Sequence, residues 1–316
     1  MKIPEVTKEQ LTKIADHLKP YIHRTPVLSS RSINKLAGCE FNFKCENFQK
    51  TGSFKIRGAM NAVLSKSDEE LKMGVVTHSS GNFAQALAYA ASRRGVRAKI
   101  VMPESVIPSK RDAVLSYGAE IIYSGNLPID RETKCAEVVE NTGALFIHPS
   151  NDIKVILGHS SCAIELESDA EYLDYVFCPV GGGGLISGIS LGLNSFSPGT
   201  KIIAGEPLNA DDAYQSVLAG KIIPQTNPDT IADGLRTSLG DVTFPIIQEH
   251  VDEIIRVSEE EIVSAMKMIW ERMKIIAEPS GAVGFAAALQ RAAVLKNKNV
   301  GIIISGGNVN LTSLPF

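Results

Sequence analysis

Short runs of apolar residues recur along the chain, and several are followed by stretches whose apolar positions have helical spacing. The runs are rich in Val, Ile and Phe and predict strands, whereas stretches such as residues 82–93 and 109–117 predict helices. The runs lie at residues 41–46, 74–78, 98–102, 120–123, 144–148, 174–179, 201–205 and 300–304. Because strands alternate with helices, we predict an α/β fold with parallel sheets, in which ligands bind at the carboxyl ends of the strands.

Composition narrows the class of protein. The chain has 316 residues, of which 44% are hydrophobic and 21% charged, so we expect a large core and room for two domains. The net charge is −3 without a basic cluster, which disfavours a nucleic-acid polymer as partner. The five cysteines are widely spaced, as expected for free thiols in a reducing compartment. No apolar leader and no stretch of about 18 apolar residues occurs, so we expect a cytoplasmic protein that does not enter the membrane.

Four consecutive glycines, Gly181, Gly182, Gly183 and Gly184, follow the predicted strand 174–179 and precede an apolar helix. Without side chains, their N–H groups can converge on an anion, and the helix dipole favours a phosphate. A plain tight turn is the structural alternative. The lysine of a Walker A loop is absent, and the dinucleotide fingerprint fails at Ser187. Glu206 nevertheless lies where a ribose-binding acid would be, so the residues alone leave NAD open.

Three more turns follow predicted strands. Residues 79–82 and 305–308 are rich in Ser, Gly and Asn, and either cap helices or let a ligand approach the backbone closely. The first of these turns could hold a substrate carboxylate. In residues 206–212, the carboxylates of Glu206 and Asp212 suit a hard cation such as Mg²⁺ or Ca²⁺, and a solvated acidic loop is the alternative.

Lys55 would be a surface lysine if judged alone. Its neighbours Phe54 and Ile56 are apolar, however, and a lysine in a partly dry pocket has a lowered pKa and can act as a nucleophile and a base. A lysine together with a phosphate-binding glycine loop is the minimal set of residues for pyridoxal phosphate (PLP).

The segments 53–59 (SFKIRGA), 79–82 (SSGN), 181–185 (GGGGL) and 305–309 (SGGNV) occur in this order. Together they resemble the fold-type II PLP enzymes, the family of serine and threonine dehydratases and serine racemases. The likeness covers almost the whole chain. Segments 46–59, 206–216, 230–234 and 270–274 are most similar to the eukaryotic serine racemases of this family. The resemblance implies a tryptophan synthase β-like fold, with twisted parallel sheets flanked by helices. It places a large PLP-binding domain at residues 1–73 and 151–316 and a small inserted domain at 74–150.

The resemblance also implies roles for individual residues. Lys55 would be the Schiff-base lysine and the base on one face of the α-carbon, and Ser80 the acid or base on the other. Phe54 would pack beside the PLP ring, Asn82 would bind its hydroxyl and Ser305 its pyridine nitrogen. Gly181, Gly182, Gly183, Gly184 and Leu185 would cradle the phosphate; Ser79, Ser80, Gly81 and Asn82 would hold the substrate carboxylate; Glu206, Asp212 and the Ala210 carbonyl would bind Mg²⁺, Ca²⁺ or Mn²⁺. The family likeness thus assigns Glu206 to a metal and replaces NAD by PLP.

The activity implied is serine racemisation with serine dehydration to pyruvate and ammonia. Alternatives are a threonine or threo-3-hydroxyaspartate dehydratase and a non-catalytic PLP-binding protein. Phe83 and Ser150 depart from the His and Asn typical of the family at these positions. The family likeness further implies a homodimer with ATP as an allosteric activator, although Arg31 and Ser32 depart from that pattern. The nucleotide would contact Ser30, Lys50, Thr51, Gln85, Tyr117, Lys274 and Asn308.

Overall fold

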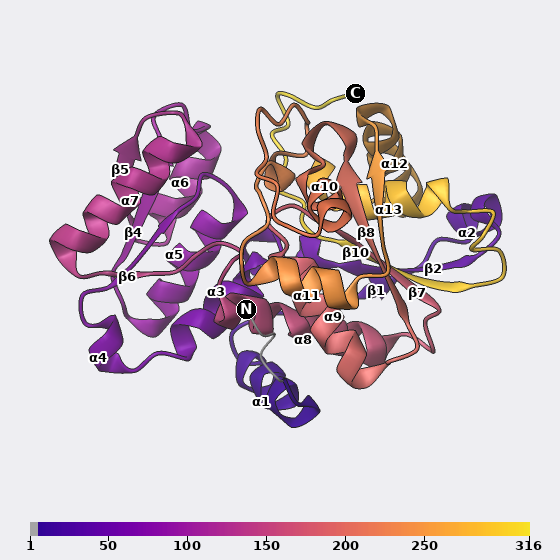
Figure 1. Ribbon diagram of the computed structural model, residues 1–316, viewed down its shortest axis with the longest axis horizontal. Coiled ribbons are helices and arrows are strands. Elements are labelled where there is room, and N and C mark those ends of the chain that lie inside the picture. Colours follow the sequence, from indigo (N-terminus) through magenta and orange to yellow (C-terminus); the bar gives the residue numbers. More distant parts are fainter. Residues whose placement is uncertain (1–5) are drawn as a thin grey trace.

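The computed structural model describes residues 6–316, except for the side chains of Ser109 and Pro128. Residues 1–5, on which the expectation of no leader peptide partly rests, lie outside this range. The chain forms two lobes, each built on its own sheet (Figure 1). This is the α/β arrangement predicted from the alternation of strands and helices.

The larger lobe contains a six-stranded sheet in the order β1-β2-β10-β7-β8-β9. All neighbours in it are parallel except β1, which pairs antiparallel with β2 at one edge. Its strands are β1 (Val27–Leu28), β2 (Glu40–Cys45), β7 (Tyr175–Pro179), β8 (Lys201–Pro207), β9 (Glu253–Val257) and β10 (Asn299–Ile304).

Helices cover both faces of this sheet (Figure 1). The side chains of β10 show why its run is apolar throughout, because Ile302 belongs to the core cluster on one face and Ile303 to the cluster on the other. Phe41 of β2 meets Phe285 of the covering helix α13 edge-to-face, with ring centres 5.4 Å apart. The helices of this lobe are α1 (Lys8–Leu18), α2 (Arg31–Ala37), α3 (Lys55–Leu64), α8 (Ile153–Asp169), α9 (Gly184–Phe196), α10 (Asp212–Ala219), α11 (Thr243–His250), α12 (Glu259–Met273) and α13 (Pro279–Gln290).

Short 3₁₀ turns complete the lobe. The turns are η1 (Glu46–Phe48), η2 (Lys50–Gly52), η3 (Leu208–Ala210) and η4 (Asp233–Leu235).

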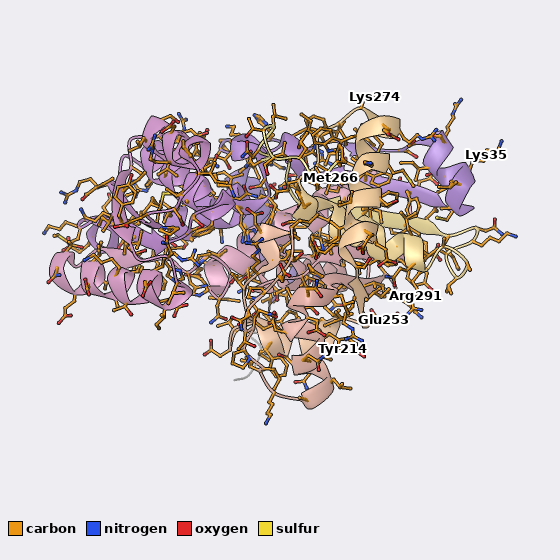
Figure 2. The ribbon with its side chains drawn as sticks, turned by 90° about the horizontal axis from the view of Figure 1, so that it is seen from above. Lys35, Tyr214, Glu253, Met266, Lys274 and Arg291 are labelled. Atoms are coloured by element: carbon orange, nitrogen blue, oxygen red, sulfur yellow. The ribbon has the colours of Figure 1, made fainter. Side chains whose placement is uncertain are left out.

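An ion pair joins the last strand to the end of a helix at the edge of the lobe. In the view from above, Glu253 of β9 pairs with Arg291 just after α13 (Figure 2).

The smaller lobe contains a parallel four-stranded sheet in the order β5-β4-β3-β6, whose strands are inserted in the chain between β2 and β7. Its helix α5 packs against α3 of the larger lobe, so the two lobes share an apolar cluster. The elements are α4 (Asp68–Leu71), β3 (Val75–His78), α5 (Asn82–Arg94), β4 (Ala98–Pro103), α6 (Pro108–Ser116), β5 (Glu120–Ser124), α7 (Pro128–Thr142) and β6 (Leu145–Phe146).

Three details differ from the strands predicted from sequence. Strand β6 covers only Leu145–Phe146 of the predicted 144–148, because the chain turns away where His148 bonds to the following amides. Strands β1 and β9 were not predicted. The first is two residues long, and the second is an edge strand that begins and nearly ends with a charged residue.

Two further properties bear on function. No helix in residues 6–316 combines the length and the apolar character needed to cross a bilayer. The five cysteines, Cys39, Cys45, Cys135, Cys162 and Cys178, are all free and buried, as expected from their spacing.

Candidate active site

The carboxyl ends of the strands bring the predicted site residues to one region. Gly181 follows β7, Ser305 follows β10, and Ser79 follows β3 of the smaller sheet. A hydrogen bond of 3.0 Å from Phe54 N to Ser305 O ties the start of α3 to the end of β10. Lys55 is the first residue of α3 and therefore lies beside these strand ends.

The Lys55 side chain points into a partly apolar environment. Its Nζ donates to Pro149 O at 3.2 Å and lies 4.9 Å and 5.9 Å from the ring centres of Phe54 and Phe83. Burial lowers the pKa of Lys55 to about 8, against the opposing effect of the Glu278 carboxylate. Far more of this amine than of an ordinary lysine is therefore unprotonated near neutral pH, and the unprotonated form can act as a nucleophile or base.

The glycine run forms a tight loop at the start of α9. A Cβ on Gly182 would lie 2.4 Å from Ser150 Oγ, and Gly183 has φ +82°, which side chains rarely adopt. Within residues 6–316, the main-chain N–H groups of residues 181–186 donate no hydrogen bond to the protein. These donors, at the positive end of a helix, fit a phosphate group.

Residues 148–151, which follow β6, contact both the glycine loop and Lys55. His148 Nδ1 accepts hydrogen bonds from the N–H groups of Ser150 (3.1 Å) and Asn151 (2.8 Å). Burial, followed by the nearby His78 and Lys55, lowers the pKa of His148 to about 4, so the ring stays neutral and remains an acceptor. Ser150, one of the two departures from the family, thus packs against Gly182.

The turn after β3 presents Ser80 near a cation. Ser80 Oγ lies 3.5 Å from Arg131 Nη1, and Gly81 N donates to Ser79 Oγ at 3.3 Å. The other departure, Phe83, is 2% exposed in α5 and places its ring near Lys55. The structure therefore brings Ser80 and Lys55 to the same part of the molecule through the short turn between β3 and α5.

Asn82 has partners that the sequence did not predict. Its Nδ2 donates to Glu278 Oε1 at 2.8 Å, and its Oδ1 accepts from Asn308 Nδ2 at 2.8 Å. Burial raises the pKa of Glu278, which is 5% exposed, to about 8. The available sequence signal for Glu278 was an acidic residue directly before the first-turn proline of an apolar helix, Pro279 of α13. Arg131 was missed as well, since an arginine in a polar helix carries no comparable signal.

The predicted metal ligands come together at the end of β8. Glu206 is 0% exposed, and its two oxygens accept from the N–H groups of Ala213 and Tyr214, both at 2.8 Å. Asp212 Oδ1 is buried without a partner. Burial raises the pKa of Glu206 to about 9 and that of Asp212 to about 7. Two buried carboxylates with an unused oxygen fit a divalent cation, although no cluster of three His, Cys, Asp or Glu side chains occurs in the described residues.

The predicted nucleotide residues are only partly brought together. Asn308 Nδ2 donates to Thr51 O at 2.8 Å, and Lys50 Nζ lies 5.8 Å from the Tyr89 ring, which stacks edge-on with Tyr117. Gln85 is buried in α5, which packs on η2. By contrast, Ser30 Oγ contacts Ser32 Oγ, and Lys274 Nζ donates to Glu271 O at the surface end of α12 (Figure 2).

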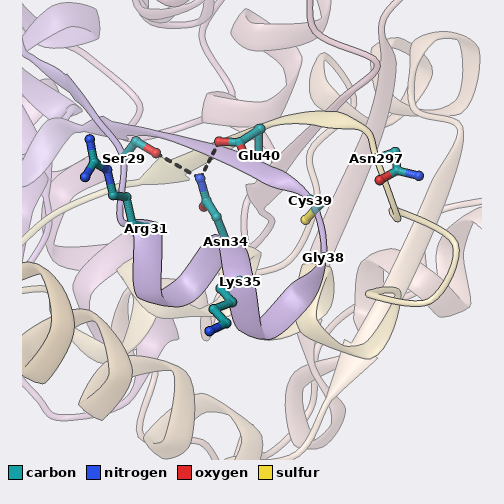
Figure 3. A pocket seen from close by; sticks show the side chains of 8 residues that line it. All are labelled: Ser29, Arg31, Asn34, Lys35, Gly38, Cys39, Glu40 and Asn297. Carbon is teal, nitrogen blue, oxygen red and sulfur yellow. Dashed lines mark hydrogen bonds between the residues drawn. The ribbon is translucent and has the colours of Figure 1, made fainter.

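A separate open cavity of about 760 Å³ lies at α2 (Figure 3). Asn34 Nδ2 crosses it to Ser29 Oγ at 3.1 Å and to Glu40 Oε2 at 2.5 Å. Its Cys39 thiol has a pKa raised to about 11 by burial and by Glu40, so it is unreactive. None of the strand-end residues of the candidate site lines this cavity.

Comparison with known proteins agrees with the geometry. Residues 18–306 match the family model described as pyridoxal-phosphate dependent enzyme, so the chain belongs to that family and uses PLP. This confirms the predicted family and fold class.

Individual proteins of this family are similar to the chain over nearly its whole length. The chain is 48% identical to a serine racemase of Dictyostelium discoideum, over 98% of this chain and 97% of that protein. It is 46% identical to a beta-hydroxyaspartate dehydratase of Paracoccus denitrificans, over 100% of both. The structure of maize serine racemase superposes with a TM-score of 0.94 at 46% identity, covering 97% of this chain and 95% of that one.

Proposed function

We propose that this enzyme interconverts L- and D-serine and also eliminates water from serine. The observation that carries the proposal is the presence of two different proton-transfer groups at the strand ends. Lys55 offers an amine of lowered pKa, and Ser80 offers a hydroxyl 3.5 Å from a guanidinium. The likeness to serine racemases over nearly the whole chain supports the same substrate.

PLP, when bound, withdraws electrons from the α-carbon of an amino acid and makes its proton removable. Lys55 Nζ would take that proton from one face of the α-carbon. Ser80 Oγ would donate a proton to the other face, which inverts the configuration. A hydroxyl is a weak acid, and the positive charge of Arg131 would stabilise the oxyanion left on Ser80.

Elimination would use the same first step. After Lys55 has taken the α-proton, the β-hydroxyl leaves as water, and hydrolysis of the released enamine gives pyruvate and ammonia. Because this route from L-serine needs no proton on the second face, Ser80 would matter less to it than to racemisation.

The remaining strand-end residues would hold the cofactor and the substrate. The free N–H groups of residues 181–185 would bind the phosphate, and Phe54 would lie beside the ring. Ser305 would bond the pyridine nitrogen, and a neutral hydroxyl there leaves that nitrogen largely unprotonated. The N–H groups of residues 79–82 would bind the substrate carboxylate, with Asn82 also reaching the ring hydroxyl.

We also propose a divalent cation between Glu206, Asp212 and the Ala210 carbonyl, with Mg²⁺, Ca²⁺ or Mn²⁺ as candidates. The ATP site and the homodimer stay part of the proposal on the resemblance alone, because within residues 6–316 the side-chain hydrogen bonds of Ser30 and Lys274 go only to residues near them in sequence. Cytoplasmic location remains the expectation from the free cysteines.

The test is chiral analysis of the products formed from L-serine by the holoenzyme, with Mg²⁺ and ATP each added or withheld. We expect both D-serine and pyruvate. Pyruvate without D-serine would overturn the racemase assignment and leave a dehydratase.

A further inference from the structure

A network of buried charges includes the helix turn that carries Lys55. Arg57, in the first turn of α3, is its central residue and is 0% exposed. Its Nε and Nη2 donate to the two oxygens of Glu46 at 2.6 Å and 2.8 Å. Its Nη1 and Nη2 donate to the two oxygens of Glu165 at 2.8 Å and 2.7 Å. Arg57 therefore makes two bidentate contacts, which together fix the plane of its guanidinium group.

A second buried cation balances the charges of this network. Lys44 Nζ, which is also 0% exposed, donates to Glu165 Oε2 and to Thr25 O, both at 2.7 Å. Thr25 Oγ1 in turn donates to Glu46 Oε1 at 2.5 Å. Burial would lower the pKa of Arg57, but Glu46 and then Glu165 raise it well above its ordinary value, so the guanidinium stays charged. A buried network whose donors and acceptors are paired in this way is rigid.

The network connects three elements of the larger lobe. Glu46 is the first residue after β2, and Glu165 belongs to α8, which packs on α3 (Figure 1). Arg57 lies two residues after Lys55, and its main-chain N–H donates to Phe54 O at 3.0 Å. A shift of α3 along its axis would break both bidentate contacts of Arg57. The start of α3, and with it Lys55, is therefore attached to β2 and to α8.

The glycine loop is held by other contacts. A Cβ on Gly183 would lie 2.8 Å from Thr243 Cβ and 2.9 Å from Leu239 Cδ2, so the loop packs closely on these two residues. Within residues 6–316, the hydrogen bonds of the Arg57 guanidinium go instead to η1, to α8 and to the segment before β1. The position of the amine and the binding of a phosphate can therefore be disturbed separately.

We propose that Arg57 is a positioning residue, which holds the first turn of α3 through Glu46 and Glu165 and so sets where Lys55 Nζ lies relative to the glycine loop. The inference rests on the proposed function, since it takes Lys55 as the residue that becomes linked to PLP. In that step the unprotonated amine adds to the aldehyde carbon; the carbon–nitrogen bond forms, and the aldehyde oxygen leaves as water with the two amine protons. Because two carboxylates neutralise Arg57, its effect on this step is one of position.

The experiment separates the binding of PLP from the formation of the covalent linkage. Apoenzyme of the full chain is mixed with increasing PLP in a stopped-flow instrument, and the dependence of the observed rate on PLP concentration gives a Kd and a first-order rate constant. The Kd reports on the glycine loop, and the rate constant reports on the placement of Lys55. A misplacement of about 1 Å costs up to roughly 100-fold in rate, so we expect the rate constant to fall on the order of 10- to 100-fold when Arg57 is replaced, with the Kd near the wild-type value.

Two variants disturb Arg57 to different extents. Arg57→Lys keeps the charge but reaches only one of the two carboxylates, and we expect an intermediate rate constant. Arg57→Met combined with Glu46→Gln removes one charge of each sign, so that no unpaired charge is left in the interior, and we expect the larger loss. Melting temperatures show that each variant is folded under the conditions of the rate measurement.

Lys44→Met is the matched control. Lys44 is as buried as Arg57, has the same charge and bonds the same Glu165, but it lies on β2 and its removal leaves both contacts of Arg57 in place. We expect a lower melting temperature with the wild-type rate constant. An equal fall of the rate constant in Lys44→Met would overturn the inference, because the network would then act only on overall stability. Wild-type rate constants in both Arg57 variants, or a weaker Kd as their sole effect, also overturn it.

Hydrogen exchange of the wild-type holoenzyme needs no variant. We expect the amides of residues 57–61 to exchange as slowly as those of β10, because the network holds the start of α3 in the core. If these amides exchange faster than those of β10, the turn opens on its own and the inference is overturned.

Lys55→Ala distinguishes a failure of this inference from a failure of the proposed function. If Lys55→Ala still forms the covalent absorbance band with PLP, the proposed role of Lys55 is wrong and the inference is overturned with it. If Lys55→Ala loses the band while the Arg57 variants keep the wild-type rate constant, only the inference fails.

Discussion

Asn82 and Glu278 are 196 residues apart in sequence, and a hydrogen bond of 2.8 Å joins them across the two lobes. Asn82 begins helix α5 of the smaller lobe, and Glu278 precedes α13 of the larger one. Asn308 completes the contact, since its main-chain N–H donates to Glu278 Oε2 at 3.2 Å. This contact attaches the turn that carries Ser80 to the larger lobe, because Asn82 is only two residues after Ser80 in the sequence.

This contact predicts the effect of Glu278→Gln. Above the Glu278 pKa of about 8, both carboxylate oxygens are acceptors. In the variant, one of them becomes an amide NH₂ that faces either the Asn82 amide or the Asn308 N–H, so at such pH one donor must lose its acceptor. An unsatisfied buried donor costs about 1–3 kcal/mol, and we expect a lower melting temperature together with a higher KM for serine. Calorimetry and initial rates check this. Wild-type KM with reduced stability would show that the contact holds the lobes without orienting the Ser80 turn.

Ser80→Ala should separate the two reactions. Removing a positioned acid or base costs roughly 10²–10⁴-fold, and we expect a loss of that size in D-serine formation from L-serine. Elimination from L-serine should fall much less, whereas elimination from D-serine should fall with racemisation because its α-proton faces Ser80. Chiral chromatography and a pyruvate assay measure these rates. Equal losses in all of them would refute proton transfer by Ser80.

The lowered pKa of Lys55 predicts how PLP binding to the apoenzyme depends on pH. Only the unprotonated amine attacks a carbonyl, so the rate should rise with pH and level off above the folded-state pKa of about 8. A lysine with the ordinary pKa of 10.5 would give a rate that keeps rising over the whole of this pH range. Stopped-flow absorbance between pH 7 and 10 distinguishes the two profiles, and Lys55→Ala should abolish the covalent signal and turnover.

Removing the divalent cation should destabilise the enzyme. A ligand present at 100 times its Kd stabilises by about 2.7 kcal/mol, so chelation should lower the melting temperature by several degrees and Mg²⁺ should restore it. Asp212→Asn should remove this response. Asp211→Asn is the matched control, because Asp211 pairs with Arg256 at 3.0 Å and is outside the proposed ligand set. If a chelator still lowered the melting temperature of Asp212→Asn, the cation would bind at a different place in the protein.

The sequence predicted those parts of the molecule that depend on local patterns. Strands buried on both faces, such as β10, are continuous apolar runs, and the loop at Gly181 is marked by the residue type that it requires. Contacts between distant segments left no such mark. Glu278 and Arg131 are ordinary charged residues in the sequence, and only folding shows that one joins the lobes while the other lies beside Ser80. The position of Lys55 was recognised through its neighbours, but its contact with Pro149 depends on the turn after β6.

The rate at which the buried cysteines are alkylated would measure local opening of each lobe. Thiol reagents attack the thiolate, and burial raises the pKa of Cys45 to about 12 and that of Cys135 to about 11. Alkylation therefore requires a local opening that exposes the sulfur. Cys135 belongs to the smaller lobe and Cys178 to the core of the larger one. Comparing the alkylation rates of these two cysteines, with and without PLP, would show which lobe loosens first and whether the cofactor slows both.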